Sequence, residues 1–136
     1  MLRALTIGLI LAGPLPALAQ QPGWAGTYAA TDGSALEATL RAPQGDRYPI
    51  EIGTGDGEGR CTGAVGGEVA LGAAGSGALQ VPNDSFDPQS RIPWLRERYC
   101  RIEIAISGPR MTLREGLGCL GFHGAACGFS GSLERR

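Results

Sequence analysis

Short stretches in which apolar and polar residues alternate run through most of the chain, and they predict β-strands. The clearest stretch is 100–106, where a cysteine and three isoleucines occupy every second position. Alternate side chains of a strand lie on one face of the sheet, and the residues between them lie on the other. We therefore expect Ile102, Ile104 and Ile106 to be fully buried at the centre of the hydrophobic core.

Other stretches repeat this period of two and are separated by residues that favour turns. They are 24–28, 36–41, 48–52, 61–65, 69–71, 79–81, 111–114 and 127–133. Turn-forming pairs such as Asp32-Gly33, Gly66-Gly67 and Gly108-Pro109 lie between them. This spacing is typical of strands that follow one another in an antiparallel meander.

The meander predicts an all-β fold, namely a small antiparallel up-and-down barrel of about eight strands. Closing the sheet removes its two edge strands, whose unpaired N–H and C=O groups would otherwise be exposed. In such a barrel the first and last strands pair, which would place Trp24 near Leu133. A two-sheet β-sandwich is the alternative arrangement. The sequence contains no internal repeat and no sign of a second domain.

Residues 82–99 interrupt the alternation and form the longest connection that the pattern predicts. They include three prolines and three arginines, and we expect one helical turn near Ile92, Leu95 and Tyr99. Connections of this length are uncommon in small domains and are often functional. We favour the interpretation that the apolar residues plug one end of the barrel. The alternative is a contact patch that uses Trp94 and Arg96, residue types enriched in interface hot spots.

The first nineteen residues have the features of a signal peptide. Arg3 precedes an apolar run, and Ala17-Leu18-Ala19 fits the small-x-small pattern at which signal peptidase cleaves. The run from Ala4 to Gly13 is too short to span a bilayer, so we expect no membrane anchor. Residues 20–136 would then form a single exported β-domain that is periplasmic or secreted.

Charge and histidine content limit the kinds of partner and of chemistry. All positive side chains are arginines, and removal of Arg3 leaves eleven of them against thirteen acidic residues, a formal charge of about −2. A nucleic-acid partner would require a basic surface, so we expect none. His123 is the only histidine and no G-x-S-x-G motif is present, so we do not expect an enzyme. Asp56 and Glu58 lack an EF-hand pattern, and we interpret their glycine-rich loop as a solvated turn.

Four cysteines, Cys61, Cys100, Cys119 and Cys127, lie in the part of the chain that would be exported. An even number of cysteines in an oxidising compartment predicts two disulfides, which would stabilise a core with few large apolar side chains. Three pairings are open, and we favour Cys61–Cys100 together with Cys119–Cys127. A zinc site would be expected to show the paired Cys-x2-Cys spacing, which is absent. We therefore expect no metal and no cofactor.

The favoured pairing makes residues 119–127 a disulfide-closed loop with His123 at its centre, flanked by Phe122 and Gly124. A loop closed at its base can present a side chain to a partner at low entropic cost. The interpretation that we favour for His123 is a structural one, a turn residue partly packed against Phe122, because one histidine in a glycine-rich loop is weak evidence for a site. The Cys-x3-His-x3-Cys pattern of the loop is similar in kind to the inhibitory loop of lysozyme inhibitors, which reads Cys-x2-His-x-Cys. The end of the chain, Cys-x-Phe-x-Gly-x-Leu-x-Arg over 127–135, resembles periplasmic lysozyme-inhibitor-like β-domains of Gram-negative bacteria.

These resemblances imply an exported module that binds a protein through the Cys119–Cys127 loop, with a lysozyme-type glycosidase as the partner they suggest. Together with the long connection they give five candidate binding residues: His123, Phe122, Gly124, Trp94 and Arg96. A second hypothesis is a barrel that binds a small apolar molecule, for which inward-facing glycine and alanine would leave room. We expect no catalytic residue under either hypothesis.

Overall fold

The computed structural model describes residues 13–14 and 23–136. The expected signal peptide and its cleavage site therefore lie outside the described residues, apart from Gly13 and Pro14. Within the described part of the chain, no helix is both long enough and apolar enough to cross a membrane.

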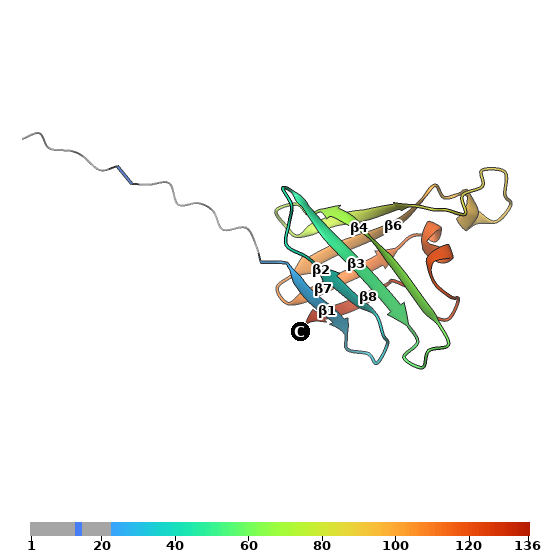
Figure 1. Ribbon diagram of the computed structural model, residues 1–136, viewed down its shortest axis with the longest axis horizontal. Helices are drawn as coiled ribbons and strands as arrows, with labels where there is room; N and C mark the ends of the chain where they lie inside the picture. Colours follow the sequence, from blue (N-terminus) through green and yellow to red (C-terminus); the bar gives the residue numbers. More distant parts are fainter. Residues whose placement is uncertain (1–12, 15–22) are drawn as a thin grey trace, which may run out of the picture.

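Eight antiparallel strands form one sheet that curls into a nearly closed barrel (Figure 1). The strands are β1 (Gly26–Ala30), β2 (Glu37–Leu40), β3 (Arg47–Gly55), β4 (Thr62–Ala70), β5 (Ser76–Pro82), β6 (Tyr99–Ser107), β7 (Arg110–Glu115) and β8 (Gly131–Arg135). Two short 3₁₀ helices, η1 (Pro93–Arg96) and η2 (Leu117–Phe122), precede β6 and β8. The predicted all-β barrel is confirmed, and the alternative β-sandwich is not formed.

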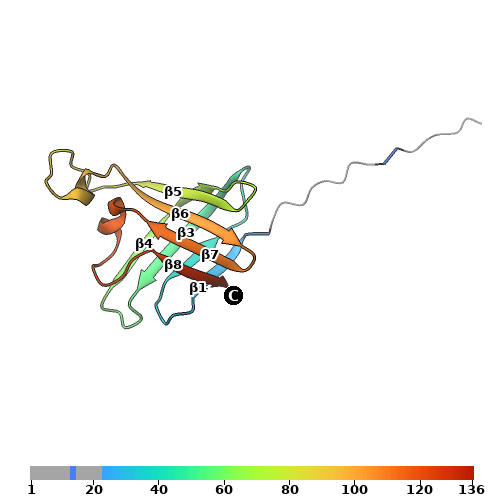
Figure 2. The ribbon, with the colours of Figure 1, turned by 180° about the vertical axis from the view of Figure 1, so that it is seen from behind.

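The first and last strands, β1 and β8, pair and close the sheet as expected, and Figure 2 shows them side by side. Their register places Ala30 opposite Leu133. Trp24 lies before the paired region, and its ring packs against Tyr48 with centroids 5.9 Å apart. The expectation that Trp24 lies near Leu133 is wrong, because the pairing involves the C-terminal half of β1.

The seam of the barrel lies between β4 and β5, which no strand pairing joins. Gly67 alternates with inward-facing valines, and a Cβ atom at this position would lie 3.0 Å from Cδ1 of Leu79 and 3.7 Å from Cγ2 of Val81. The missing side chain of Gly67 therefore lets β5 pack across the seam. The turn predicted at Gly66-Gly67 is wrong: both residues continue β4, since each pairs with a residue of β3.

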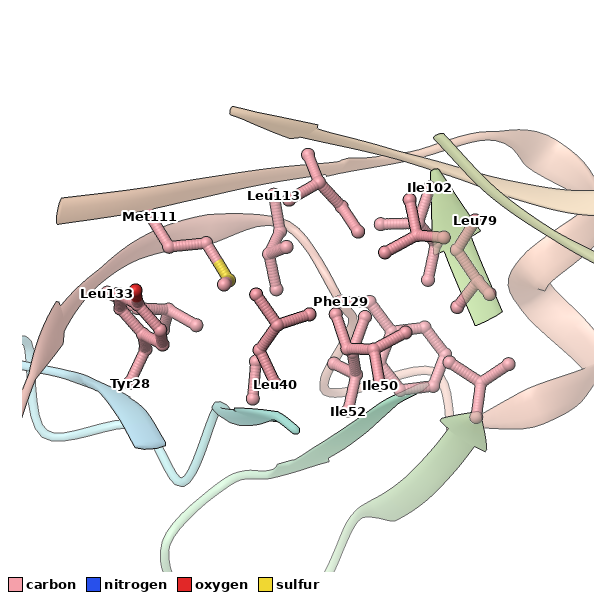
Figure 3. Close-up of a cluster of buried hydrophobic side chains, with 14 of the residues drawn as sticks. Tyr28, Leu40, Ile50, Ile52, Leu79, Ile102, Met111, Leu113, Phe129 and Leu133 are labelled. Atoms are coloured by element: carbon pink, nitrogen blue, oxygen red, sulfur yellow. The ribbon is translucent and has the colours of Figure 1, made fainter. Parts of the chain in front are cut away.

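Apolar side chains from all eight strands fill the barrel interior, as Figure 3 shows for the largest of them. Ile102, Ile104 and Ile106 are 0%, 2% and 5% exposed, which confirms the predicted centre of the core. Phe129, which precedes β8, is also fully buried in this cluster.

The two ends of the barrel differ in the length of their connections. At one end, strands are joined by short turns, of which the shortest is Gly108-Pro109. At the other, here called the long-connection end, residues 83–98 join β5 to β6 and residues 116–130 join β7 to β8. The last strand is shorter than the predicted 127–133, because Cys127 and the Gly128 carbonyl are bonded to the β3–β4 region and leave the line of β8.

We predict that Ile104→Ala lowers the free energy of unfolding by about 2–5 kcal/mol, the usual range for a large-to-small change in a packed core. Ala105→Ser, on the outer face of the same strand, is the control and should change it by about 0.5 kcal/mol or less. Denaturant-induced unfolding measures both variants. A loss below about 0.5 kcal/mol for Ile104→Ala would show that β6 does not form the core.

Candidate functional site

Two disulfides hold the β7–β8 connection across the long-connection end of the barrel. Cys100, in β6, is bonded to Cys119 in η2, and Cys61, just before β4, is bonded to Cys127. Two disulfides were expected, but the favoured pairing of Cys61 with Cys100 and of Cys119 with Cys127 is wrong. Two such bonds indicate an oxidising, extracellular-type environment.

The observed pairing follows from the path of the β7–β8 connection. η2 packs beside β6, whereas the segment after it reaches β4 on the other side of the seam, where residue 123 bridges to Gly63. Cys119 therefore meets the cysteine of β6, and Cys127 meets the cysteine next to β4. Cys119 and Cys127 are close in sequence, but they lie on opposite sides of the seam, Cys119 beside β6 and Cys127 beside β4.

His123 is buried beneath this connection. Its side chain is 3% exposed, and its Nε2 atom lies 3.0 Å from Oε2 of Glu115. Its Nδ1 atom lies 2.7 Å from the carbonyl oxygen of Gly124, and its ring meets Phe129 edge-on with centroids 5.1 Å apart. The expectation that His123 projects toward a partner is wrong, because Glu115 and Phe129 hold the imidazole inside.

The two hydrogen bonds of the His123 ring show where its hydrogen atoms must lie. A carbonyl oxygen only accepts hydrogen bonds, so Nδ1 carries a hydrogen and donates it to Gly124. A second hydrogen must lie between Nε2 and the Glu115 carboxyl group for a bond to form there. Either an imidazolium faces a carboxylate or a neutral imidazole accepts from a protonated carboxyl group. In both forms the bond ties the end of β7 to the connection.

The residues beside His123 also take part in closing the barrel. Phe122 packs against the core, and a Cβ atom at Gly124 would lie 2.8 Å from Sγ of Cys61. A Cβ atom at Gly63 would lie 2.3 Å from Cβ of His123, so the bridge to β4 requires glycine there. The structure thus brings Phe122, His123 and Gly124 together at the seam, where they close the barrel.

The sequence of η2, Leu-Gly-Cys-Leu-Gly-Phe, repeats every three residues, which is the period of a 3₁₀ helix. Residues three apart therefore share a face. Cys119 and Phe122 face the core, whereas Leu117 and Leu120 face solvent and are 55% and 41% exposed. This period of three is a signal for the helix that a search for alternating strands does not detect.

The glycines of η2 form its third face, which packs against the β5–β6 connection. A Cβ atom at Gly118 would lie 2.1 Å from the carbonyl oxygen of Tyr99, and one at Gly121 would lie 3.2 Å from the ring of Trp94. Glycine at both positions lets the helix approach this closely. The two long connections therefore form one continuous structure.

Asn83 organises the β5–β6 connection. Its buried side-chain amide donates hydrogen bonds to the carbonyl oxygens of Trp94, at 3.1 Å, and of Glu97, at 2.9 Å. The N–H group of Asp87 donates to the carbonyl oxygen of Leu95 at 2.7 Å. These bonds cross the connection from one side to the other and give it a defined shape.

The β5–β6 connection stands out from the barrel and does not plug it (Figure 1). Asn83 is the one buried residue among residues 83–98. The favoured interpretation that this segment plugs one end is therefore wrong, since Phe122 and Phe129 of the β7–β8 connection pack into the core there. The predicted helical turn is confirmed as η1, which carries both Trp94 and Arg96.

All the large hydrophobic side chains that remain exposed in the described residues belong to these two connections or their edges. They are Ile92, Tyr99, Leu117 and Leu120. With the half-buried Trp94 they define what we call the η1–η2 surface. All of these side chains therefore lie at the long-connection end of the barrel.

Charges beside the η1–η2 surface are balanced. Residues 83–98 carry three arginines, Arg91, Arg96 and Arg98, and three acids, Asp84, Asp87 and Glu97. The guanidinium group of Arg98 lies over the ring of Phe86, 4.7 Å from its centroid. These charges sum to zero, so the segment exerts little long-range electrostatic attraction on a charged molecule.

The β3–β4 loop, at the same end, is ordered by Asp56. Its carboxylate accepts hydrogen bonds from the N–H groups of Glu58 and Arg60 and from Nε of Arg60. Burial alone would raise the pKa of Asp56, but the hydrogen bonds outweigh that effect and hold the pKa below its ordinary value. The carboxylate thus stabilises the fold above the pKa of the unfolded chain, and this stabilisation is lost as the pH falls through the folded pKa.

Comparison with known proteins adds no relative to this description. No protein-family model, curated protein or solved structure matches the chain. The similarity of the chain end to lysozyme-inhibitor-like domains therefore stays a prediction, and the functional proposal depends on the geometry of the long-connection end.

We predict that peptide mapping of the unreduced protein links Cys61 to Cys127 and Cys100 to Cys119. Trypsin cleaves after arginine and chymotrypsin after Phe122, so the two proteases together place all four cysteines on separate peptides. Mass spectrometry then identifies each linked pair. A peptide that joins Cys61 to Cys100 would contradict the structure.

We predict that His123→Ala lowers the free energy of unfolding by about 1–3 kcal/mol, because it leaves the largely buried Glu115 carboxyl group without its partner. Chemical denaturation of His123→Ala, Glu115→Ala and the double variant completes a double-mutant cycle. The double variant should lose less stability than the sum of the two single variants. Additive losses would show that the two side chains do not interact.

Proposed function

We propose that this protein is an exported binding module that recognises another protein through the η1–η2 surface. The observation that carries the proposal is the gathering of exposed large hydrophobic side chains at this one end of the barrel. Buried aromatic and arginine side chains contribute much of the binding energy at protein interfaces. The surface offers Trp94 and Tyr99 beside Arg96, with Ile92 and the two η2 leucines around them.

The shape of the β5–β6 connection suits a partner with a concave surface. The connection projects from the barrel (Figure 1), and the hydrogen bonds of Asn83 and Asp87 hold its form. A preformed loop loses little conformational entropy on binding, so more of its contact energy appears as affinity. Leu117 and Leu120 would contact the rim of the concave surface when the loop enters it.

An enzyme with an active-site cleft fits this shape, and a lysozyme-type glycosidase is our specific proposal for the partner. The similarity of residues 127–135 to lysozyme-inhibitor-like domains supports it. Of the contact residues first expected, Trp94 and Arg96 remain in this proposal, whereas Leu117 and Leu120 of η2 take the place of the buried His123. We further propose that residues 1–19 are a signal peptide and that the protein acts in the periplasm or outside the cell without catalysing a reaction itself.

The packed interior does not favour the second hypothesis, a barrel that binds a small apolar molecule. Inward-facing glycine was expected to leave room for such a ligand. At Gly67 this room is taken by the side chains of Leu79 and Val81, and large side chains meet across the interior in Figure 3.

We predict that Ile92→Asp and Leu117→Asp each weaken partner binding at least tenfold, about 1.4 kcal/mol. The reason is that each would place a charge in an apolar contact. Ser107→Asp, at the opposite end of the barrel, is the matched control and should bind as the wild type does. All three positions are exposed, so the melting temperature should stay nearly unchanged. The assays are inhibition of cell-wall lysis by a purified lysozyme and capture from periplasmic extract.

The full proposal is supported if the protein inhibits lysozyme, if Ile92→Asp and Leu117→Asp lose this inhibition, and if Ser107→Asp retains it. Capture of another protein with the same dependence on Ile92 and Leu117 would support the binding surface and reject lysozyme as the partner. Binding that neither variant weakens would contradict the η1–η2 surface. If the protein self-associates and both variants abolish the self-association, the η1–η2 surface binds a second copy of this chain and the proposal of a different protein as partner is wrong.

A further inference from the structure

Arg101 differs from the other arginines on the barrel strands of the described chain, because its guanidinium group has no partner there. The others each have a partner. Arg47 forms an ion pair with Glu68, Arg110 donates to Glu134, Arg114 donates to Glu103, and Arg135 donates to the hydroxyl of Tyr28 and the carbonyl oxygen of Gly23. Arg101 is exposed on the outer face of β6. Five N–H donors of this side chain are therefore available to a ligand.

The sheet register explains why Arg101 has no partner. On β5 it lies opposite Gln80, which carries no charge. On the other side β7 ends at Glu115, whose carboxyl group bonds to His123, and Gly116 follows. The carboxylate of Glu103, two residues away on the same face, is bound by Arg114. The neighbouring carboxyl groups of Glu103 and Glu115 are thus bonded to other residues.

Arg101 lines a groove of about 730 Å³ on the outer face of β5, β6 and β7. Small side chains leave this space open, namely those of Ser76, Ala78 and Ala105. Gln80, Thr112 and the bonded pair of Glu103 and Arg114 complete the polar lining. The groove is open to solvent, and its volume is within the range of small-molecule sites.

The charges of the lining indicate the chemical class of ligand. Two arginines and Glu103 give the groove a net charge of +1. One carboxylate group would neutralise this charge, and its two oxygens match the two parallel N–H groups of a guanidinium fork. A phosphate dianion would leave excess negative charge beside Glu103.

We propose that this groove binds a small ligand that carries one carboxylate group, with Arg101 as the anchor. Gln80 and Thr112 then donate or accept hydrogen bonds with the rest of the ligand. The site uses none of the residues of the η1–η2 surface, so it goes beyond the proposed function and is tested separately from it. A peptide carboxyl terminus and an acidic sugar both offer the required chemistry.

The test is a titration of ¹⁵N-labelled protein that follows the amide signals of Ala78 and Ala105 and the Nε–H signal of Arg101. N-acetylalanine represents a peptide terminus and glucuronic acid represents an acidic sugar. N-acetylalanine amide and glucose are the neutral counterparts, and inorganic phosphate is the dianion. We expect saturable shifts with at least one carboxylate, at millimolar or lower concentration, and weaker or no shifts with its neutral counterpart. The carboxylate that saturates identifies the source.

Two variants test the anchor. Arg101→Gln should weaken binding at least tenfold, about 1.4 kcal/mol, whereas Arg110→Gln, on the same outer face but outside the groove, should not. Ala105→Leu should also weaken binding by filling the groove without changing its charge. The proposal is overturned if no carboxylate saturates by about 100 mM, if the neutral counterpart or phosphate binds as well, or if the two arginine variants behave alike.

Discussion

Residues 116–130 are held at two points by disulfides, and the shape of the long-connection end depends on this constraint. One bond ties the segment to β6 and the other to the start of β4, so it lies across the seam of the barrel. The bonds close loops with sequence separations of 66 and 19 residues. By chain entropy alone such loops stabilise a fold by about 4 and about 3 kcal/mol, and these values do not add because the loops overlap. That is a large fraction of the usual stability of a small domain.

The position of residues 116–130 across the seam also bears on the two edge strands of the sheet, β4 and β5. β4 and β5 do not pair, so their backbone groups would be open to another strand. The side chain of Leu79 packs against Gly67 in the middle of the seam, and the bridge between Gly63 and His123 covers the beginning of β4. Glycine at both β4 positions makes this closure possible. The burial of His123 is thus a consequence of the closure of the barrel at the seam.

The strands and the core could be predicted because they depend on local patterns. Alternation over residues 100–106 determines which isoleucines face inward. The succession of short strands joined by turns predicts the meander, and a closed meander requires β1 to pair with β8. Positions whose structure depends on distant residues could not be predicted in this way. Gly66-Gly67 is a sequence typical of a turn, but pairing with β3 keeps both residues in a strand. The cysteine pairing depends on which side of the seam each part of residues 116–130 reaches. The repeat of three in residues 117–122 was present in the sequence but has a different period from the strands around it.

The long-connection end of the barrel is held in one shape in the free protein by its hydrogen bonds and disulfides. Amide hydrogen exchange of the free protein tests this claim most directly. Asn83 and Asp87 donate backbone hydrogen bonds across the β5–β6 connection, so their amides should exchange at least about 100-fold more slowly than in an unfolded chain. Exchange of both amides at the unfolded rate would show that the connection takes its shape only on binding, and would contradict the claim.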